Sequence, residues 1–219
     1  MAERDQAPRI YVLAGVNGAG KSSIGGAAFD ERGAEYFNPD LASRRIRQAD
    51  ASLTLTEANS LAWHQGRRLL ERAIAERRDF AFETTLGGNS ITGLLGQASE
   101  QGLEVFVWYA GLRSPELHMA RVRQRVLRGG HDIPESDIHR RYESSRLNLI
   151  RLLPQLAELR LYDNSVEADP EQAQPPQVRL ILHVVRSKIV GPEDLEQTPE
   201  WAKPIVAAAL RLAAQRTSS

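Results

Sequence analysis

Short apolar runs alternate with longer amphipathic stretches along this chain, the order that is typical of an α/β protein. The apolar runs predict strands at residues 9–14, 35–37, 79–85, 104–110, 158–162 and 178–185. The amphipathic stretches predict helices at residues 21–29, 41–47, 56–78, 91–101, 114–128, 135–153 and 200–215. The helix at 56–78 follows a candidate capping box, Thr54-Leu-Thr-Glu57, and its expected apolar residues are Leu61, Leu69, Leu70, Ala73 and Ile74. We therefore expect a single α/β domain over residues 1–219, in which helices cover both faces of a mostly parallel sheet in three layers.

A glycine-rich segment links the first predicted strand to the helix after it. Residues 15–22 read Gly-Val-Asn-Gly-Ala-Gly-Lys-Ser and match the pattern G-x-x-x-x-G-K-[ST]. In such a P-loop the main-chain N–H groups surround a phosphate, and the start of the helix adds a positive dipole. The segment therefore predicts a three-layer P-loop NTPase fold that binds ATP with Mg²⁺. The expected nucleotide-binding residues are Gly15, Asn17, Gly18, Ala19, Gly20, Lys21, Ser22 and Ser23.

Two of these residues have separate expected roles. Lys21 should reach the β- and γ-phosphates, and the Ser22 hydroxyl should be a ligand of Mg²⁺. Only three of the 28 basic residues are lysines, and one of the three stands at this position. A P-loop establishes nucleotide binding but not what the nucleotide is used for.

Composition narrows the class of protein further. The 219-residue chain has no cysteine, so a disulfide framework and cysteine-ligated metals are excluded. Its longest apolar run, residues 105–112, is too short to cross a membrane, and residues 1–9 do not resemble a signal peptide. We therefore expect a cytoplasmic protein. Because the net charge is zero, we do not expect the protein to bind nucleic acid through its overall charge.

Two carboxylates stand where a kinase needs them. Asp40 follows a predicted strand and opens a helix, so it either accepts the proton of an acceptor hydroxyl or caps that helix. Glu83 ends a predicted strand, at the sheet edge where ligands bind, and would hold Mg²⁺ or a substrate hydroxyl. Thr84 and Thr85 beside it either contact substrate or begin a turn.

Arginines are concentrated between residues 121 and 151, which carry eight of them against four acidic residues. Gly129 and Gly130 separate the two helices of this segment and are candidates for a hinge. If the segment forms a lid over the nucleotide, its arginines would stabilise the charge on a transferred phosphoryl group. For any single arginine, the favoured reading is a solvated position on a helix surface with ion pairs. The arginines expected at the site are Arg128, Arg140 and Arg141.

Six segments taken together resemble the small zeta-toxin-like P-loop kinases, over about residues 10–165. They are residues 15–22, Phe37-Asn-Pro-Asp40, Phe82-Glu-Thr-Thr-Leu86, Gly129-Gly-His-Asp-Ile-Pro-Glu135, Arg140-Arg-Tyr142 and Leu161-Tyr-Asp-Asn-Ser165. The better-known zeta toxins phosphorylate a hydroxyl of UDP-N-acetylglucosamine with ATP. By resemblance, Asp40 is the general base, Glu83 the substrate or metal carboxylate, and the lid arginines clamp phosphoryl groups. The resemblance also implies an antitoxin protein as a partner.

Two other functions remain open. A P-loop ATPase or nucleotide switch would act through a protein partner, for which the acidic stretch 163–200 and the final helix offer a surface. A polynucleotide kinase would use the arginine segment as an RNA track, but Tyr142 is the only aromatic residue in that segment. A kinase acting on a nucleotide sugar or a similar small molecule is the function we favour.

Overall fold

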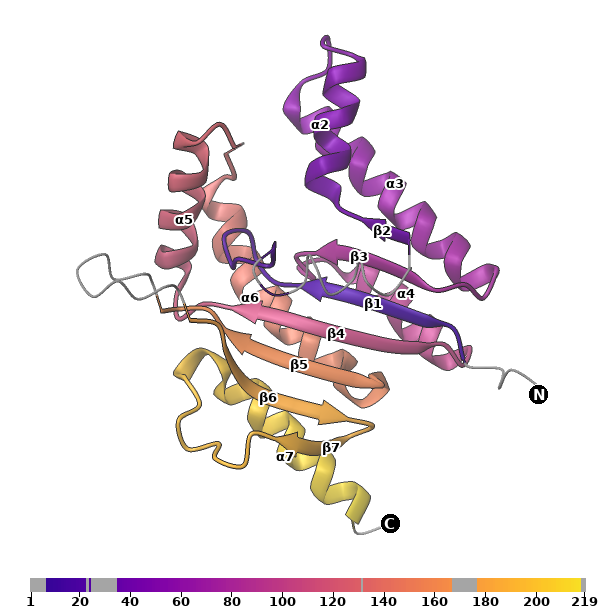
Figure 1. The fold of residues 1–219 in the computed structure, drawn as a ribbon, viewed down its shortest axis with the longest axis vertical. Helices are drawn as coiled ribbons and strands as arrows, with labels where there is room; N and C mark the ends of the chain where they lie inside the picture. Colours follow the sequence, from indigo (N-terminus) through magenta and orange to yellow (C-terminus); the bar gives the residue numbers. More distant parts are fainter. Residues whose placement is uncertain (1–6, 23, 25–34, 131, 167–176, 218–219) are drawn as a thin grey trace.

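The computed structural model of the protein describes residues 7–22, 24, 35–130, 132–166 and 177–217. Within these ranges the strands form one seven-stranded sheet in the order β2-β3-β1-β4-β5-β6-β7 (Figure 1). The first five strands of that order are parallel, and β6 and β7 are antiparallel to their neighbours. The predicted fold class, a mostly parallel α/β sheet of the P-loop type, is confirmed.

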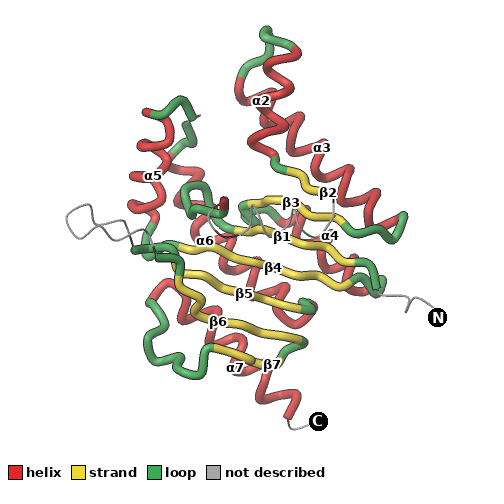
Figure 2. Tube along the Cα trace, in the orientation of Figure 1, coloured by secondary structure: helices red, strands yellow, loops and turns green. Residues whose placement is uncertain are grey.

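The element bounds follow the predicted ones closely (Figure 2). The strands are β1 (Arg9–Ala14), β2 (Glu35–Phe37), β3 (Phe80–Thr84), β4 (Glu104–Gly111), β5 (Glu158–Asp163), β6 (Arg179–Val185) and β7 (Lys188–Gly191). The α-helices are α2 (Pro39–Ala49), α3 (Leu55–Ala75), α4 (Asn89–Glu100), α5 (Pro115–Leu127), α6 (Glu135–Leu152) and α7 (Lys203–Thr217). Short 3-10 turns, η1 (Leu153–Gln155) and η2 (Glu200–Ala202), precede β5 and α7.

The main core lies on one face of the sheet. Alternate residues of the central strands, such as Ile10 and Val12, point into a cluster with buried side chains of α3, α4, α6 and α7. In Figure 1 the helices α4, α6 and α7 lie behind the sheet. The opposite face carries a smaller cluster around Tyr11, Leu13 and Trp108, on which Ile24 packs. Most of the helix predicted at 21–29 lies outside the described residues.

Helix α3 begins as its sequence predicts but buries a different stripe. Thr54 and Glu57 form a reciprocal capping box, which satisfies two N–H groups of the first turn. Its buried positions are mostly small residues: Ala58, Ala62, Gly66, Leu70, Ala73 and Ile74. Leu61, expected on the apolar face, is off this stripe and 45% exposed.

The arginine-rich segment is only partly separate from the core. Helix α6 buries a row of side chains that includes Tyr142, Leu149 and Leu152, and these join the main cluster. Val122, Ile133 and Ile138 form a small cluster with Val16 of the P-loop. The hinge expected at Gly129 and Gly130 lies just after α5, where Gly129 has a φ of +86°. Because α6 is anchored in the main core, the lid expected over residues 121–151 stays a prediction only for α5 and this connection.

The C-terminal part adds a hairpin and a helix to the sheet edge. Arg186 and Ser187 turn the chain from β6 into β7, and both have positive φ angles. Trp201 of η2 is buried over Gly111, where a Cβ atom would meet the indole at 2.2 Å. Among the described residues, none of the helices has the length and apolar character needed to span a membrane.

Candidate active site

The P-loop leaves β1 in a conformation that requires glycine. Gly15, Gly18 and Gly20 have φ angles of +142°, +82° and +77°. A Cβ atom on Gly15 would lie 2.4 Å from the Ala110 carbonyl oxygen, and one on Gly18 would lie 2.7 Å from the His118 carbonyl oxygen. The loop is therefore pressed against β4 and α5, an approach that only glycine permits at these two positions.

Lys21 is held inside this loop. Its Nζ donates to the Gly15 carbonyl oxygen at 3.0 Å. Burial lowers the pKa of Lys21, while the nearby carboxylates of Glu83 and Asp40 oppose that shift. A phosphate in the loop would replace the carbonyl as partner of this ammonium group. Ser22 is exposed at the start of the following helix, and Ser23 lies outside the described residues.

Two buried side chains donate hydrogen bonds to main-chain carbonyl groups of the P-loop. His118 Nδ1 donates to the Asn17 carbonyl oxygen at 2.8 Å, and Asn164 Nδ2 donates to the Ala19 carbonyl oxygen at 2.9 Å. Burial lowers the pKa of His118 to about 4, so the imidazole is neutral at pH 7. Sequence reasoning gave His118 no role, because a single histidine on a helix has no distinguishing pattern.

Glu83 and Asp40 are linked through the start of α2. Tyr36 and Asn38 both donate to Glu83 Oε1, the Asn38 amide at 2.9 Å. The Asn38 Oδ1 atom accepts from the backbone N–H groups of Asp40 and Leu41, at 2.9 and 3.1 Å. The helix cap is therefore Asn38, and the reading of Asp40 as the cap is wrong, because Asp40 is already in the first helical turn after Pro39.

The Asp40 carboxylate instead faces the arginine-rich segment. Arg125 Nη1 of α5 lies 3.2 Å from Asp40 Oδ2. Thr84 Oγ1 accepts from the Leu86 N–H at 3.0 Å, and the Thr85 carbonyl accepts from the Ser145 hydroxyl at 2.7 Å. Both threonines thus shape the turn after β3 while also lining the cavity described below.

The expected arginines have different surroundings. Arg141 bridges the P-loop and α6: its Nη1 donates to Asn17 Oδ1 and its Nη2 to Asp137 Oδ2, each at 2.8 Å. Burial lowers the pKa of Arg141, although not enough to discharge a guanidinium at pH 7. Arg140 pairs with Asp137 at 2.7 Å. Arg128 is exposed and does not line the cavity.

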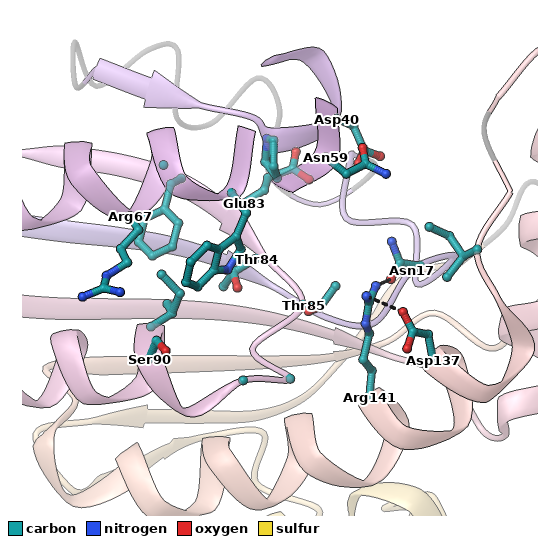
Figure 3. Close-up of a pocket in the computed structure, with 18 of the residues that line it drawn as sticks. Asn17, Asp40, Asn59, Arg67, Glu83, Thr84, Thr85, Ser90, Asp137 and Arg141 are labelled. Carbon is teal, nitrogen blue, oxygen red and sulfur yellow. Dashed lines mark hydrogen bonds and ion pairs between the residues drawn. The ribbon is translucent and has the colours of Figure 1, made fainter. Parts of the chain in front are cut away.

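These groups surround a cavity of about 550 Å³ between α2, α3, the ends of β3 and α6. Figure 3 shows Asp40 and Glu83 on one wall and Asn17 and Arg141 on another. Asn17 of the P-loop lines the cavity and Lys21 does not. The cavity therefore lies beside the P-loop rather than inside it. The polar and charged residues that line it are Asn17, Asp40, Thr56, Asn59, Arg67, Glu83, Thr84, Thr85, Ser90, Asp132, Asp137, Arg140 and Arg141.

The donor set near the P-loop suits magnesium. Among the described residues there is no group of three histidine or carboxylate side chains that would hold a metal by itself. Mg²⁺ commonly keeps several waters and binds through one or two protein oxygens plus substrate phosphates. The Ser22 hydroxyl and the Glu83 carboxylate are hard oxygen donors of this kind.

Comparison with known proteins agrees with the class of protein that this fold and site define, a P-loop nucleotide-binding protein. Residues 10–145 match the family described as AAA domain. The chain is also 32% identical, over 129 residues, to an uncharacterized protein of Haemophilus influenzae; the match covers 58% of this chain and 88% of that protein. The chain belongs to the AAA domain family.

Solved structures with the same fold include two complexes. A chain of the AvrRxo1-ORF1:-ORF2 complex with ATP superposes with a TM-score of 0.66 and 16% identity over 94% of this chain. A chain of the PezAT toxin-antitoxin system of Streptococcus pneumoniae superposes with a TM-score of 0.52 and 14% identity; the match covers all of this chain and 90% of the other. The present chain spans only 64% of the AvrRxo1 chain. These likenesses establish the P-loop kinase-like fold.

Proposed function

We propose that the protein is an ATP-dependent phosphotransferase of the zeta-toxin type, which transfers the γ-phosphate of ATP to a hydroxyl of a small acceptor. The observation that carries this proposal is the position of Asp40. Its carboxylate lines a cavity that adjoins the P-loop, and Glu83 and Arg141 line the same cavity. An acceptor in that cavity would have a base on one side and the nucleotide phosphates on the other.

The transfer step follows from this arrangement. The acceptor hydroxyl oxygen bonds to the γ-phosphorus, the bond from that phosphorus to the β,γ-bridging oxygen breaks, and ADP leaves with the electron pair. The hydroxyl proton goes to the Asp40 carboxylate. Lys21 neutralises charge on the β- and γ-phosphates. Ser22 and Glu83 would hold Mg²⁺, which would supply further positive charge there when bound.

Arg141 and Arg125 are the arginines best placed to act on the phosphoryl group. Arg141 already contacts Asn17 of the P-loop, and Arg125 contacts Asp40. Arg140 also lines the cavity, and its side chain is largely exposed. A guanidinium fork can hold two phosphoryl oxygens at once, so these side chains would restrain the transferred group during the step.

A nucleotide sugar such as UDP-N-acetylglucosamine is the acceptor that we propose. The cavity volume of about 550 Å³ is within the range of pockets that enclose a ligand of that size. The likeness to a chain of a toxin-antitoxin system supports an antitoxin protein as partner. The resemblance to zeta-toxin-like kinases in the sequence motifs adds independent support for this substrate class.

Mass spectrometry tests the proposal directly. The protein is incubated with ATP, Mg²⁺ and a panel of UDP-sugars and nucleosides, and the acceptors are examined for a gain of about 80 Da, the mass of one phosphoryl group. ADP release that requires one of these acceptors is the expected result. ADP release that is the same with and without every acceptor would favour the P-loop ATPase or switch that acts through a protein partner.

A further inference from the structure

The cavity extends well past the residues that transfer requires. Figure 3 shows Arg67 and Ser90 on the opposite side from Asn17 and Arg141, with Glu83 and Thr84 between them. Arg67 comes from the middle of α3 and Ser90 from the first turn of α4. We call this part of the cavity the far end, and define it by Phe37, Trp63, Arg67, Ser90 and Ile91. Phosphoryl transfer explains none of these side chains.

Trp63 is the distinctive residue of the far end. It lines the cavity and is 41% exposed, whereas Trp108 and Trp201 are 6% and 4% exposed. The edge of its ring meets His64, with ring centroids 4.9 Å apart, and the Arg67 guanidinium lies 6.0 Å from its centroid. An indole left this accessible in a concave site is a surface on which a flat ring can stack.

The helix that carries Trp63 is packed closely onto an aromatic floor. A Cβ atom on Gly66 would lie 2.5 Å from Phe37, so α3 can approach this ring only because residue 66 has no side chain. A glycine inside a helix is less favourable than alanine, but at this position it permits the close contact with Phe37. Trp63 therefore lies on α3 one turn from Gly66, the position at which this helix packs against Phe37 of the sheet.

Polar groups accompany the aromatic surface. Arg67 Nε is paired with Glu71 Oε1 at 2.9 Å, which fixes the guanidinium beside the indole. Because a guanidinium has five N–H donors, the remaining ones can serve a ligand. Asn59 and Ser90 add an amide and a hydroxyl to the cavity wall. A flat ring with carbonyl and N–H groups on its edge matches such a combination of stacking surface and hydrogen-bonding groups.

We propose that the far end binds the planar base of the acceptor, stacked on Trp63, and that this contact selects nucleotide-type acceptors over simple sugar phosphates. The placement of the acceptor hydroxyl at Asp40 rests on the proposed function, but base binding at Trp63 does not require transfer to occur. Trp63 is in this proposal a specificity-determining residue, and the base would be held on the side of the cavity away from the P-loop.

Calorimetric binding without ATP tests the proposal separately from catalysis. The probes are UDP-N-acetylglucosamine, the four ribonucleoside monophosphates and N-acetylglucosamine 1-phosphate, which has no base. We expect at least one base-bearing probe to bind, and the base-free probe to bind at least about 10-fold more weakly. The same titrations are repeated with Lys21→Ala. This variant weakens binding of the probes' phosphate groups to the P-loop, so the binding that remains reports on the far end.

Variants of Trp63 complete the test. Trp63→Leu should weaken binding of the base-bearing probe roughly 5- to 150-fold, the range that one stacked base contributes, and should leave binding of the base-free probe unchanged. Trp63→Phe should restore most of the binding, because phenylalanine keeps an aromatic face. Leu61→Ala is the matched control, since Leu61 is similarly exposed on α3 but does not line the cavity.

Several outcomes would overturn the proposal: no binding of any base-bearing probe, equal binding of the base-free probe, or equal affinities of Trp63→Leu and the wild type. Failure of the proposed function gives a different result. In that case a base-bearing probe still binds at Trp63, but no acceptor gains a phosphoryl group when ATP and Mg²⁺ are added.

Discussion

Arg125 and Asp40, 85 residues apart in sequence, form an ion pair in which Nη1 lies 3.2 Å from Oδ2. The two side chains are 33% and 40% exposed, so the pair contributes little to stability, about 1 kcal/mol or less. It can therefore be exchanged at low cost for a contact between Arg125 and a phosphate. The ion pair brings α5 close to the base that we propose for the transfer step.

Arg125→Ala should therefore slow transfer without unfolding the protein. We expect kcat to fall by roughly 10- to 1,000-fold, because an arginine that contacts the transferred group stabilises its developing charge. The melting temperature without ligand should change by no more than a few degrees. Arg123→Ala is the control, since Arg123 is on the same helix and pairs with Glu135 at the exposed surface. Equal kinetics for the two variants would contradict the role of Arg125.

Lys21→Ala should abolish nucleotide-dependent activity and leave the fold intact. Lys21 Nζ donates to the Gly15 carbonyl oxygen of the P-loop rather than to a group of the core, so the free energy of unfolding without ligand should change little. ATP should raise the melting temperature of the wild type and raise that of the variant much less. Thermal unfolding with and without ATP measures this difference. Equal ATP-induced shifts in the two proteins would refute the assignment of the P-loop.

Glu83→Gln separates the metal or acceptor role from the base role. If Glu83 helps to hold Mg²⁺ or an acceptor hydroxyl, its neutral analogue should raise the concentration of Mg²⁺ or acceptor needed for half-maximal rate. Titrations of both ligands in steady-state assays measure the change. A loss of kcat alone, with both half-saturation concentrations unchanged, would instead assign the proton-accepting role to Glu83.

His118 makes stability depend on pH below neutrality. Its folded-state pKa of about 4 is lower than the ordinary 6.5, so its stabilising effect is complete above pH 6.5 and is lost as the pH falls toward 4. Between pH 7.5 and 5.0 the wild type should lose about 2 kcal/mol more unfolding free energy than His118→Gln, whose side chain does not titrate. Urea unfolding at both pH values measures the difference. Parallel pH profiles for the two proteins would contradict this account of the buried imidazole.

Local patterns in the sequence predicted most of the fold. The apolar run at 9–14 and the glycines after it were sufficient for β1 and the P-loop, because both depend on neighbouring residues alone. The short strand β7 was not predicted, because only two of its residues, Ile189 and Val190, are large and apolar. The apolar face of α3 was predicted wrongly at Leu61, because the small residues Ala58 and Ala62 occupy the buried positions in the first half of this helix.

In the candidate site, the sequence predicted the residues that lie near the carboxyl ends of strands and did not predict the others. Glu83 is the penultimate residue of β3, and Asp40 lies in the first turn of α2, the helix that follows β2. Because β2 and β3 are neighbouring parallel strands, sheet topology brings the two carboxylates together. Trp63 and Arg67 reach the cavity only because α3 packs across Phe37, a contact that no sequence pattern in either segment indicates. His118 and Asn164 likewise meet the P-loop through tertiary packing alone.

The kinetics of Asp40→Asn test the central claim most directly. Asparagine keeps the size of the side chain but cannot accept the hydroxyl proton, so kcat for acceptor-dependent ADP release should fall by roughly 10²–10⁴-fold. The affinity for ATP should stay nearly unchanged, because the P-loop does not involve Asp40. Asp50→Asn, at the other end of α2, should behave as the wild type. A kcat for Asp40→Asn near that of the wild type would contradict the proposal that this protein transfers phosphate with Asp40 as its base.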